Sequence, residues 1–392
     1  MFIEMKVVGR LYLSEAILLC ILPFVYRIRS RLLFSHWPKT LIFLIILWLT
    51  SQILTDIIRM TPFEDWTRGW SKIIFLLTDF IAIYLLIDNR VNRYLLFALG
   101  LAFGKLLTFY FNPNIYAIDE PWKFGYGAAI TILAVIYVQL GISKRSVLYN
   151  ISILIILAFA NIFMGFRSLG AVCLATAIMF YVLINNQNKV VRIKFKNIVF
   201  LLTLGIISFF IFYKMYEYMA LSGLLGAVQE DKFLNQSSGD FGFLLGGRNE
   251  LFASVQAVID SPLIGHGSWA KDPKYRDIMF DALIEHGYIS DNLIINDNDL
   301  IPSHSHIMGA WVEAGLMGAL FWIWTVSISF KTLSRLLAGP NPLFILASFF
   351  TIGFIWDIIF SPLGAEARVN DAFTLSLMIY VLTYNNKNIK KY

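Results

Sequence analysis

The chain has little charge for its length. Asp, Glu, Lys and Arg together make up 15% of its 392 residues, whereas hydrophobic residues make up 58%, and the mean hydropathy is +0.68. A soluble globular domain is nearer half apolar and a quarter charged. The composition therefore excludes an ordinary soluble domain and predicts an integral membrane protein.

Cysteine is also scarce, and several signals of other protein classes are missing. The two cysteines, Cys20 and Cys173, both fall inside apolar blocks, where a small core residue is expected and a disulfide is not. We find no internal repeat of the kind that many secondary transporters carry. A cleavable signal peptide is also missing, so we expect the first apolar block to stay as an anchor.

The hydrophobic residues are concentrated in blocks such as 40–58 and 198–213. A helix needs about 20 apolar residues to cross the hydrocarbon core, and on this basis we predict about eleven transmembrane helices, with twelve as the alternative. The first span is interrupted by Glu15, so a re-entrant or interfacial helix is the alternative there. The predicted spans are 11–26, 40–58, 72–88, 94–111, 125–142, 147–164, 169–185, 198–214, 307–329, 342–360 and 371–384.

The charges follow membrane topology, which is why a net charge of +6 does not predict a nucleic-acid partner. One set of loops contains no Asp or Glu and holds more than half of the 32 basic residues, which marks the cytoplasmic side. These loops are 27–39, 89–93, 143–146, 186–197, 331–341 and the tail after 385. The opposite loops are mixed or acidic, so the N-terminus is predicted outside and the C-terminus inside.

We therefore predict an all-α polytopic membrane protein with one large periplasmic loop. N-terminal transmembrane helices occupy 1–215, the loop occupies 216–303, and C-terminal transmembrane helices occupy 304–392. Within the loop, 249–259 has helical apolar spacing and Pro262 follows its end, so the loop is expected to be partly helical.

Two arginines stand where an anion could bind. Arg248 follows Gly246-Gly247 just before the predicted loop helix, and a helix N-terminus with an adjacent guanidinium favours phosphate. Arg167 lies in a very short connection between two spans, where a charge usually has a partner. The alternatives are a solvated loop arginine for Arg248 and a snorkelling or lipid-contacting arginine for Arg167.

Two of the five histidines, His304 and His306, stand at the mouth of a span that also contains Glu313. A neutral imidazole at an interface can accept a proton from a sugar hydroxyl. Polar capping of the span is the alternative. Metal binding is disfavoured, because His-x-His lacks an obvious third and fourth ligand.

Other charged groups have simpler interpretations. Asp297-Asn298-Asp299 has the spacing of a divalent-ion site for nucleotide phosphates, but we favour a solvated acidic loop, since nucleotide sugars are made in the cytosol. Asp79 and Lys105 fall mid-span in neighbouring segments, where a structural ion pair is favoured over a proton relay.

Three motifs, in this order, resemble those of the O-antigen ligase/polymerase family of bacterial membrane glycosyltransferases. They are GFRSLGAV (165–172), GRNELFASVQAVIDSPLIGHG (247–267) and HSHIMGAWVEAGLMG (304–318), and they cover about 160–330 of the chain. The third resembles the family's His-Asn block followed by Glu-x-Gly-x-x-Gly. It departs from that pattern in having Ser305 after His304, and then a second histidine.

The resemblance implies a GT-C-like fold in the bacterial inner membrane and an active site that faces the periplasm. It implies an inverting reaction on undecaprenyl-diphosphate-linked glycans, as donor and as acceptor, with no metal and no cofactor. By position, Arg167 and Arg248 would bind the diphosphate, and His304 would orient or deprotonate the acceptor hydroxyl. His306 and Glu313 are further candidate substrate-binding residues. Membrane lipids and a chain-length regulator protein are the other expected partners.

Three functions stay open. A polymerase would transfer a growing lipid-linked glycan onto a lipid-linked repeat unit, and a ligase would transfer it to lipid A–core. We favour the polymerase on overall likeness, because the motifs serve the donor chemistry that both reactions share. A flippase or transporter of lipid-linked sugars is the alternative from another class, and the long loop with polar residues on one face argues against it.

Overall fold

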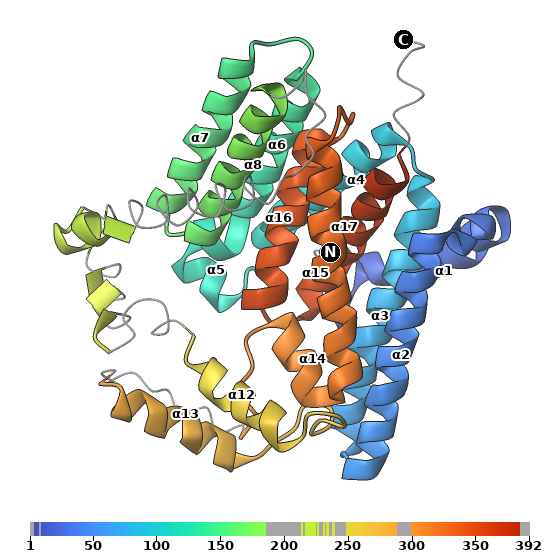
Figure 1. Ribbon diagram of the computed structural model, residues 1–392, viewed down its shortest axis with the longest axis vertical. Coiled ribbons are helices and arrows are strands. Elements are labelled where there is room, and N and C mark those ends of the chain that lie inside the picture. The colour runs from blue at the N-terminus through green and yellow to red at the C-terminus, as the bar shows by residue number, and fades with distance from the viewer. Residues whose placement is uncertain are drawn as a thin grey trace. The chain divides into compact units, whose positions relative to one another are not determined.

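The computed structural model describes residues 4–7, 9–185, 213–214, 216–224, 226, 230–231, 233–234, 237–239, 248–287 and 299–384. Apart from the hairpin of β1 (Glu4–Val7) and β2 (Gly9–Tyr12), its long elements are helices (Figure 1). The predicted loop 186–197, almost all of the predicted span 198–214, Gly246, Gly247, Asp297, Asn298 and the C-terminal tail lie outside the described residues.

The chain divides into two compact units, which we describe separately. The membrane unit comprises Met1–Val190, Ser261–Ala270 and Ser305–Tyr392, and the loop unit comprises Val191–Asp260 and Lys271–His304. The segment Ser261–Ala270 lies within the predicted loop 216–303, yet its contacts place it in the membrane unit.

α-Helices of different lengths build the membrane unit. Their bounds are α1 (Leu13–Arg29), α2 (His36–Arg59), α3 (Phe63–Ile87), α4 (Val91–Phe111), α5 (Ile115–Asp119), α6 (Gly127–Gly141), α7 (Val147–Phe163), α8 (Arg167–Asn185), α14 (His306–Ala314), α15 (Leu316–Leu337), α16 (Phe344–Phe360) and α17 (Ala365–Thr383). A short 3₁₀ helix, η1 (Ser30–Phe34), and a π-helical turn, η2 (Pro121–Tyr126), complete them. In Figure 1, α16 lies beside both α8 and α15, and α7 packs along α8.

Within the described residues, six helices are long and apolar enough to cross a membrane, and α7 and α16 are shorter apolar helices. The six are α2, α3, α4, the continuous stretch Pro121–Gly141, α8 and α15. Large apolar side chains such as Phe43, Leu96 and Ile156 are exposed on these helices, as lipid contact requires. The helices thus have the character of a polytopic membrane protein, whereas the count of eleven spans remains a prediction.

One predicted span is not a continuous helix. The stretch 307–329, predicted as a single helix, is broken at Gly315 into α14 and α15. Gly315 has φ +68°, a conformation that glycine adopts without the steric penalty of a side chain. A Cβ there would lie 2.1 Å from the carbonyl oxygen of Leu263, so the break makes room for another part of the chain.

Glu15, which interrupts the first predicted span, is compatible with a helix because it is paired. Arg368 Nε donates to Glu15 Oε1 over 2.7 Å and Arg368 Nη2 donates to Oε2 over 2.9 Å, and the Glu15 side chain is fully buried. A buried carboxylate needs such a partner. The pair joins α1 to α17, while α1 packs along α3.

The loop unit contains α12 (Glu250–Asp260), close to the predicted 249–259, and α13 (Pro273–Glu285). Asp272 caps α13 by accepting from the amide of Lys274, and Pro273 occupies the first helical turn, where its missing N–H has no cost. Asp260 at the end of α12 accepts from Lys274 Nζ (2.6 Å) and from the Tyr275 hydroxyl (2.8 Å), which joins the two helices.

The strand-like segment that leads to His304 is fixed to α13. Lys271 and Leu300 form an isolated antiparallel bridge, and the amide of Asp272 donates to the carbonyl of Asp299 over 2.8 Å. The Asp299 carboxylate forms an ion pair with Arg276. The backbone just before His304 is therefore held by the same unit that contains α12.

Candidate functional site

Two of the predicted site residues, Arg248 and His304, meet in the loop unit. Arg248 lies two residues before α12, whose first residue is Glu250, and His304 is the last residue of the unit. His304 Nδ1 lies 4.0 Å from Glu250 Oε1, and the charge of Arg248 acts on the same imidazole. The structure thus brings together residues that are 56 positions apart in sequence, at the beginning of a helix.

The electrostatics of this cluster favour a neutral imidazole. Burial lowers the pKa of His304 below its ordinary value, Arg248 lowers it further, and Glu250 opposes both. The His304 side chain is still 46% exposed, so a ligand can reach it. A neutral, accessible imidazole can accept a proton from a hydroxyl group.

Arg248 keeps its positive charge in this setting. Burial lowers the pKa of its guanidinium and Glu250 opposes that shift, but an arginine stays protonated under ordinary conditions. Arg248 lies two residues before the first residue of α12, and at a helix N-terminus amide hydrogens and the helix dipole also favour an anion. The cluster therefore offers a cation for an anionic group beside a base for a hydroxyl.

Arg167, the third predicted residue, is the first residue of α8 in the membrane unit. The turn before it is tight. Gly165 has φ +79°, and the amide of Phe166 donates to the carbonyl of Asn161 over 2.7 Å. A Cβ on Gly170 would lie 2.8 Å from the carbonyl oxygen of Ala158, so α7 and α8 approach closely here. Arg167 therefore lies at the tight junction of two closely packed helices.

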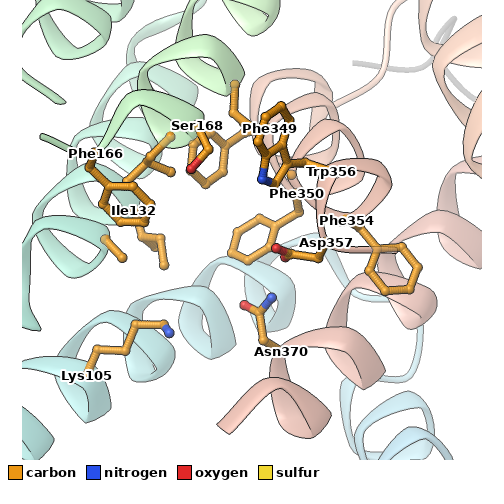
Figure 2. A pocket seen from close by; sticks show the side chains of 14 residues that line it. Lys105, Ile132, Phe166, Ser168, Phe349, Phe350, Phe354, Trp356, Asp357 and Asn370 are labelled. Atoms are coloured by element: carbon orange, nitrogen blue, oxygen red, sulfur yellow. The ribbon is translucent and has the colours of Figure 1, made fainter. Parts of the chain in front are cut away.

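The neighbours of Arg167 line a cavity of about 180 Å³ in the membrane unit (Figure 2). Ser168 and Phe166 come from the α7–α8 turn. Lys105 comes from α4, Asp357 from α16 and Asn370 from α17, and Figure 2 shows these three side chains directed toward the same space. All lie near one end of the bundle, where α4 and α16 end and α8 and α17 begin.

His306 and Glu313, the two further candidate substrate-binding residues, both have partners within the membrane unit. His306 is 1% exposed, and its Nδ1 and Nε2 lie 2.5 Å from the carbonyl oxygen of Ser361 and 3.2 Å from Asp371 Oδ2. Glu313 pairs with Lys72 over 2.6 Å. Both side chains are thus engaged within the membrane unit, and His304 is the accessible histidine of the motif.

The expected Asp79–Lys105 ion pair is replaced by other neighbours. Asp79 is fully buried beside Glu15 and Arg368, whereas Asp357 is the carboxylate with the largest influence on Lys105. The two residues are on neighbouring helices in sequence, but their side chains serve different parts of the bundle. Lys105 belongs to the cavity.

Sequence reasoning missed Asp56, near the end of α2. Its Oδ1 accepts from the amide of Ser268 (2.6 Å) and from the Thr61 hydroxyl (2.9 Å). Its Oδ2 accepts from the Ser268 hydroxyl and from Trp70 Nε1, both over 2.7 Å. A carboxylate near the end of an otherwise apolar predicted span was the available signal.

Arg59, one turn further along α2, holds the same segment. Its Nη2 donates to the Ser261 hydroxyl and to the Gly265 carbonyl, both over 2.8 Å. Asp56 and Arg59 therefore attach Ser261–Ala270 to α2 at two points. The chain enters the loop unit from both ends of this segment.

Glycines of the second and third motifs pack against one another. The amide of His266 donates to the Val312 carbonyl over 2.7 Å, and the amide of Gly267 donates to the Glu313 carbonyl over 3.1 Å. A Cβ on Gly265, which has φ +85°, would lie 2.6 Å from the Gly315 nitrogen. These glycines serve backbone contact between two distant parts of the chain.

Within the described residues, no three His, Cys, Asp or Glu side chains gather in a way that could hold a metal ion. The loop unit offers a cation and a neutral imidazole, and the membrane unit separately offers Arg167 and a mixed polar cavity. Such groups can neutralise an anionic leaving group and assist a hydroxyl nucleophile.

Comparison with known proteins finds a match to a family model. Residues 153–323 match the family model described as O-antigen ligase. The match begins within α7 and ends within α15, so it includes Arg167, Arg248 and His304. No curated protein and no solved structure matches the chain significantly.

Proposed function

We propose, from the membership of this chain in the O-antigen ligase/polymerase family through residues 153–323, that it polymerises lipid-linked oligosaccharide repeat units. The donor would be an undecaprenyl-diphosphate-linked glycan, and the acceptor a second lipid-linked repeat unit. The reaction would occur at the periplasmic face of the bacterial inner membrane, within a GT-C-like arrangement of helices. A chain-length regulator protein is a candidate partner.

The observation that carries the proposal is the cluster of Arg248, Glu250 and His304 inside the matched region. Transfer of a glycan from a lipid diphosphate breaks the bond between the sugar C1 and the diphosphate oxygen. The leaving group departs with negative charge, and a guanidinium neutralises such charge with bidentate geometry. Arg248 would neutralise the departing diphosphate, and Arg167 of the membrane unit would contribute in the same way.

The acceptor contributes a hydroxyl oxygen that forms the new bond to C1. Its proton must leave during the transfer, and His304 is the proposed acceptor of that proton because its lowered pKa keeps the imidazole neutral. Attack opposite the departing diphosphate inverts the configuration at C1. The proposed transfer proceeds without a metal, since arginines take the place of a divalent cation in neutralising the diphosphate.

A ligase is the second candidate, because the matching family is described as O-antigen ligase. Supplying the purified protein with lipid-linked repeat units alone separates the two. We expect a ladder of products that differ by one repeat unit. Product that forms only after lipid A–core is added would replace the polymerase by the ligase. Movement of intact lipid-linked sugar across a vesicle membrane, with no transfer under either condition, would support a flippase.

A further inference from the structure

Lys105 places an ammonium group in the cavity of Figure 2, and its neighbours along α4 are mostly apolar. With the described residues this ammonium forms no hydrogen bond or ion pair within the usual distances, although the charges of Asp357, Glu366 and Asp371 act on it. A charged group inside a membrane protein is costly and most often has a functional partner. The missing partner is therefore expected to be a ligand that enters the cavity.

The polar groups of the wall decide which kind of ligand fits. Lys105 and Ser168 can donate, Asp357 can accept, and the amide of Asn370 can do both. A phosphate group only accepts hydrogen bonds and would be repelled by the Asp357 carboxylate. Sugar hydroxyls both donate and accept, so a sugar can use all four side chains.

The apolar residues of the cavity wall and the cavity volume also favour a sugar. Phe349, Phe350 and Trp356 supply flat apolar surface, against which the C–H face of a sugar ring can pack. The cavity measures about 180 Å³. For comparison, a cavity of about 150 Å³ in another protein holds one benzene molecule. The space therefore suits one six-membered ring and not an oligosaccharide.

The position of the cavity suggests which sugar it receives. Phe166 and Ser168, the residues on either side of Arg167 in sequence, both line it. We infer that the cavity is a subsite for the sugar bonded directly to the donor's diphosphate, with Lys105 and Asp357 selecting its ring substituents. The inference rests on the proposed function for the diphosphate at Arg167, and it assigns a sugar-specificity role to α4 and α16.

The test measures binding of synthetic lipids to the full-length protein in lipid nanodiscs. The probes are a polyprenyl diphosphate without sugar and polyprenyl diphosphates with a single sugar, either N-acetylglucosamine or N-acetylgalactosamine. Loss of one hydrogen bond to a charged group should weaken the sugar-bearing probes about 10-fold or more in Lys105→Met. The sugarless probe should bind Lys105→Met as it binds the wild type, and Asp357→Asn should change the ranking of the two sugars.

Two further variants keep the result interpretable. Lys123→Met, whose lysine pairs with Glu120 and is absent from the cavity wall, should bind all probes like the wild type. Asn370→Ala removes a wall amide and leaves every charged side chain of the wall in place, and it should also weaken only the sugar-bearing probes. It replaces Lys105→Met if that variant does not fold.

The possible outcomes distinguish a failure of the sugar subsite from a failure of the proposed function. If Lys105→Met weakens the binding of sugarless and sugar-bearing probes equally, Lys105 binds the diphosphate, and the sugar subsite is overturned. Unchanged binding of every probe in the cavity variants, with polymer still formed by the wild type, would also overturn the subsite and leave the proposed function intact. Sugar-selective binding that depends on Lys105, without polymer or ligated product from the wild type, would support the subsite and remove the proposed function.

Discussion

Asp56 binds Ser268, 212 residues further along the chain, through both the amide and the hydroxyl of the serine, over 2.6 and 2.7 Å. The carboxylate is 3% exposed, so these hydrogen bonds are shielded from water. The segment Ser261–Ala270 that they hold separates the two sequence portions of the loop unit. Asp56 is therefore a structural anchor for the membrane-unit segment that connects the two sequence portions of the loop unit.

Replacing Asp56 by Ala should lower the free energy of unfolding by about 2–4 kcal/mol, because a buried amide, two hydroxyls and an indole lose their acceptor. The measurement is a denaturation midpoint of the purified protein in detergent. Glu64→Gln, which changes an exposed carboxylate in the first turn of α3, is the control and should leave the midpoint unchanged. A wild-type midpoint for Asp56→Ala would show that the anchor contributes little.

Gly315→Ala should destabilise the protein severely. The new Cβ would lie 2.1 Å from the Leu263 carbonyl oxygen, at a residue with φ +68°. This backbone conformation, with φ +68° and ψ −157°, alone costs a non-glycine residue about 1–3 kcal/mol, before the clash is counted. Loss of monodisperse protein in size-exclusion chromatography is the expected result.

Gly100→Ala is the matched control, because no atom lies within 4 Å of a Cβ built at this position of α4. Alanine is preferred to glycine inside a helix by up to about 1 kcal/mol, so this variant should be as stable as the wild type or slightly more stable. Equal behaviour of the two alanine variants would mean that the α14–α15 break tolerates a side chain.

Much of the fold could be predicted because its signals are local. Apolar runs long enough to span a bilayer correspond to helices in the described residues, and α12 matches the predicted 249–259 almost residue for residue. The break at Gly315 could not be predicted in this way. Its cause is the backbone of Leu263, more than fifty positions away in sequence, and no periodicity records such a contact.

The candidate site was predictable to a similar degree. The motifs identified Arg248 and His304, which the structure places beside the same glutamate, Glu250. They favoured His304 over His306 as the catalytic histidine by position in the motif, but they could not predict the surroundings of either side chain. Burial separates the two, since Asp371 and Ser361 enclose His306 from segments near the C-terminus.

Substitution of Arg248, Arg167 or His304 by Ala should abolish glycan transfer while the protein still inserts into the membrane. Each loss is expected to reach at least about 100-fold, the usual effect of removing a group that stabilises transition-state charge or transfers a proton. Arg248→Lys should also be poorly active, because lysine lacks the planar fork that binds two phosphate oxygens. Radiolabelled product per unit of membrane-inserted protein is the measurement. Wild-type product from Arg248→Ala would remove the diphosphate-binding role of this arginine.

Chelation should leave the rate unchanged. If arginines neutralise the diphosphate, excess EDTA removes nothing that the transfer step requires. The assay compares initial rates with lipid-linked repeat units before and after dialysis against EDTA. A rate that is lost in EDTA and restored by magnesium would contradict the proposed chemistry.

Glu250→Gln should move the acidic limb of the pH–rate profile to lower pH. The proposed base form of His304 is lost as the pH falls through its pKa, so activity declines on the acidic side. Glu250 raises that pKa, against the lowering by burial and by Arg248, and its removal therefore lowers the pKa further. The neutral imidazole then persists to a lower pH. Initial rates of transfer measured across pH 4–8 would show the shift.

The control is Asp281→Asn, which changes an exposed carboxylate on α13 of the same unit and should leave the acidic limb in place. A limb that moves to higher pH in Glu250→Gln, or that moves equally in both variants, would mean that a group other than His304 sets the acidic limit.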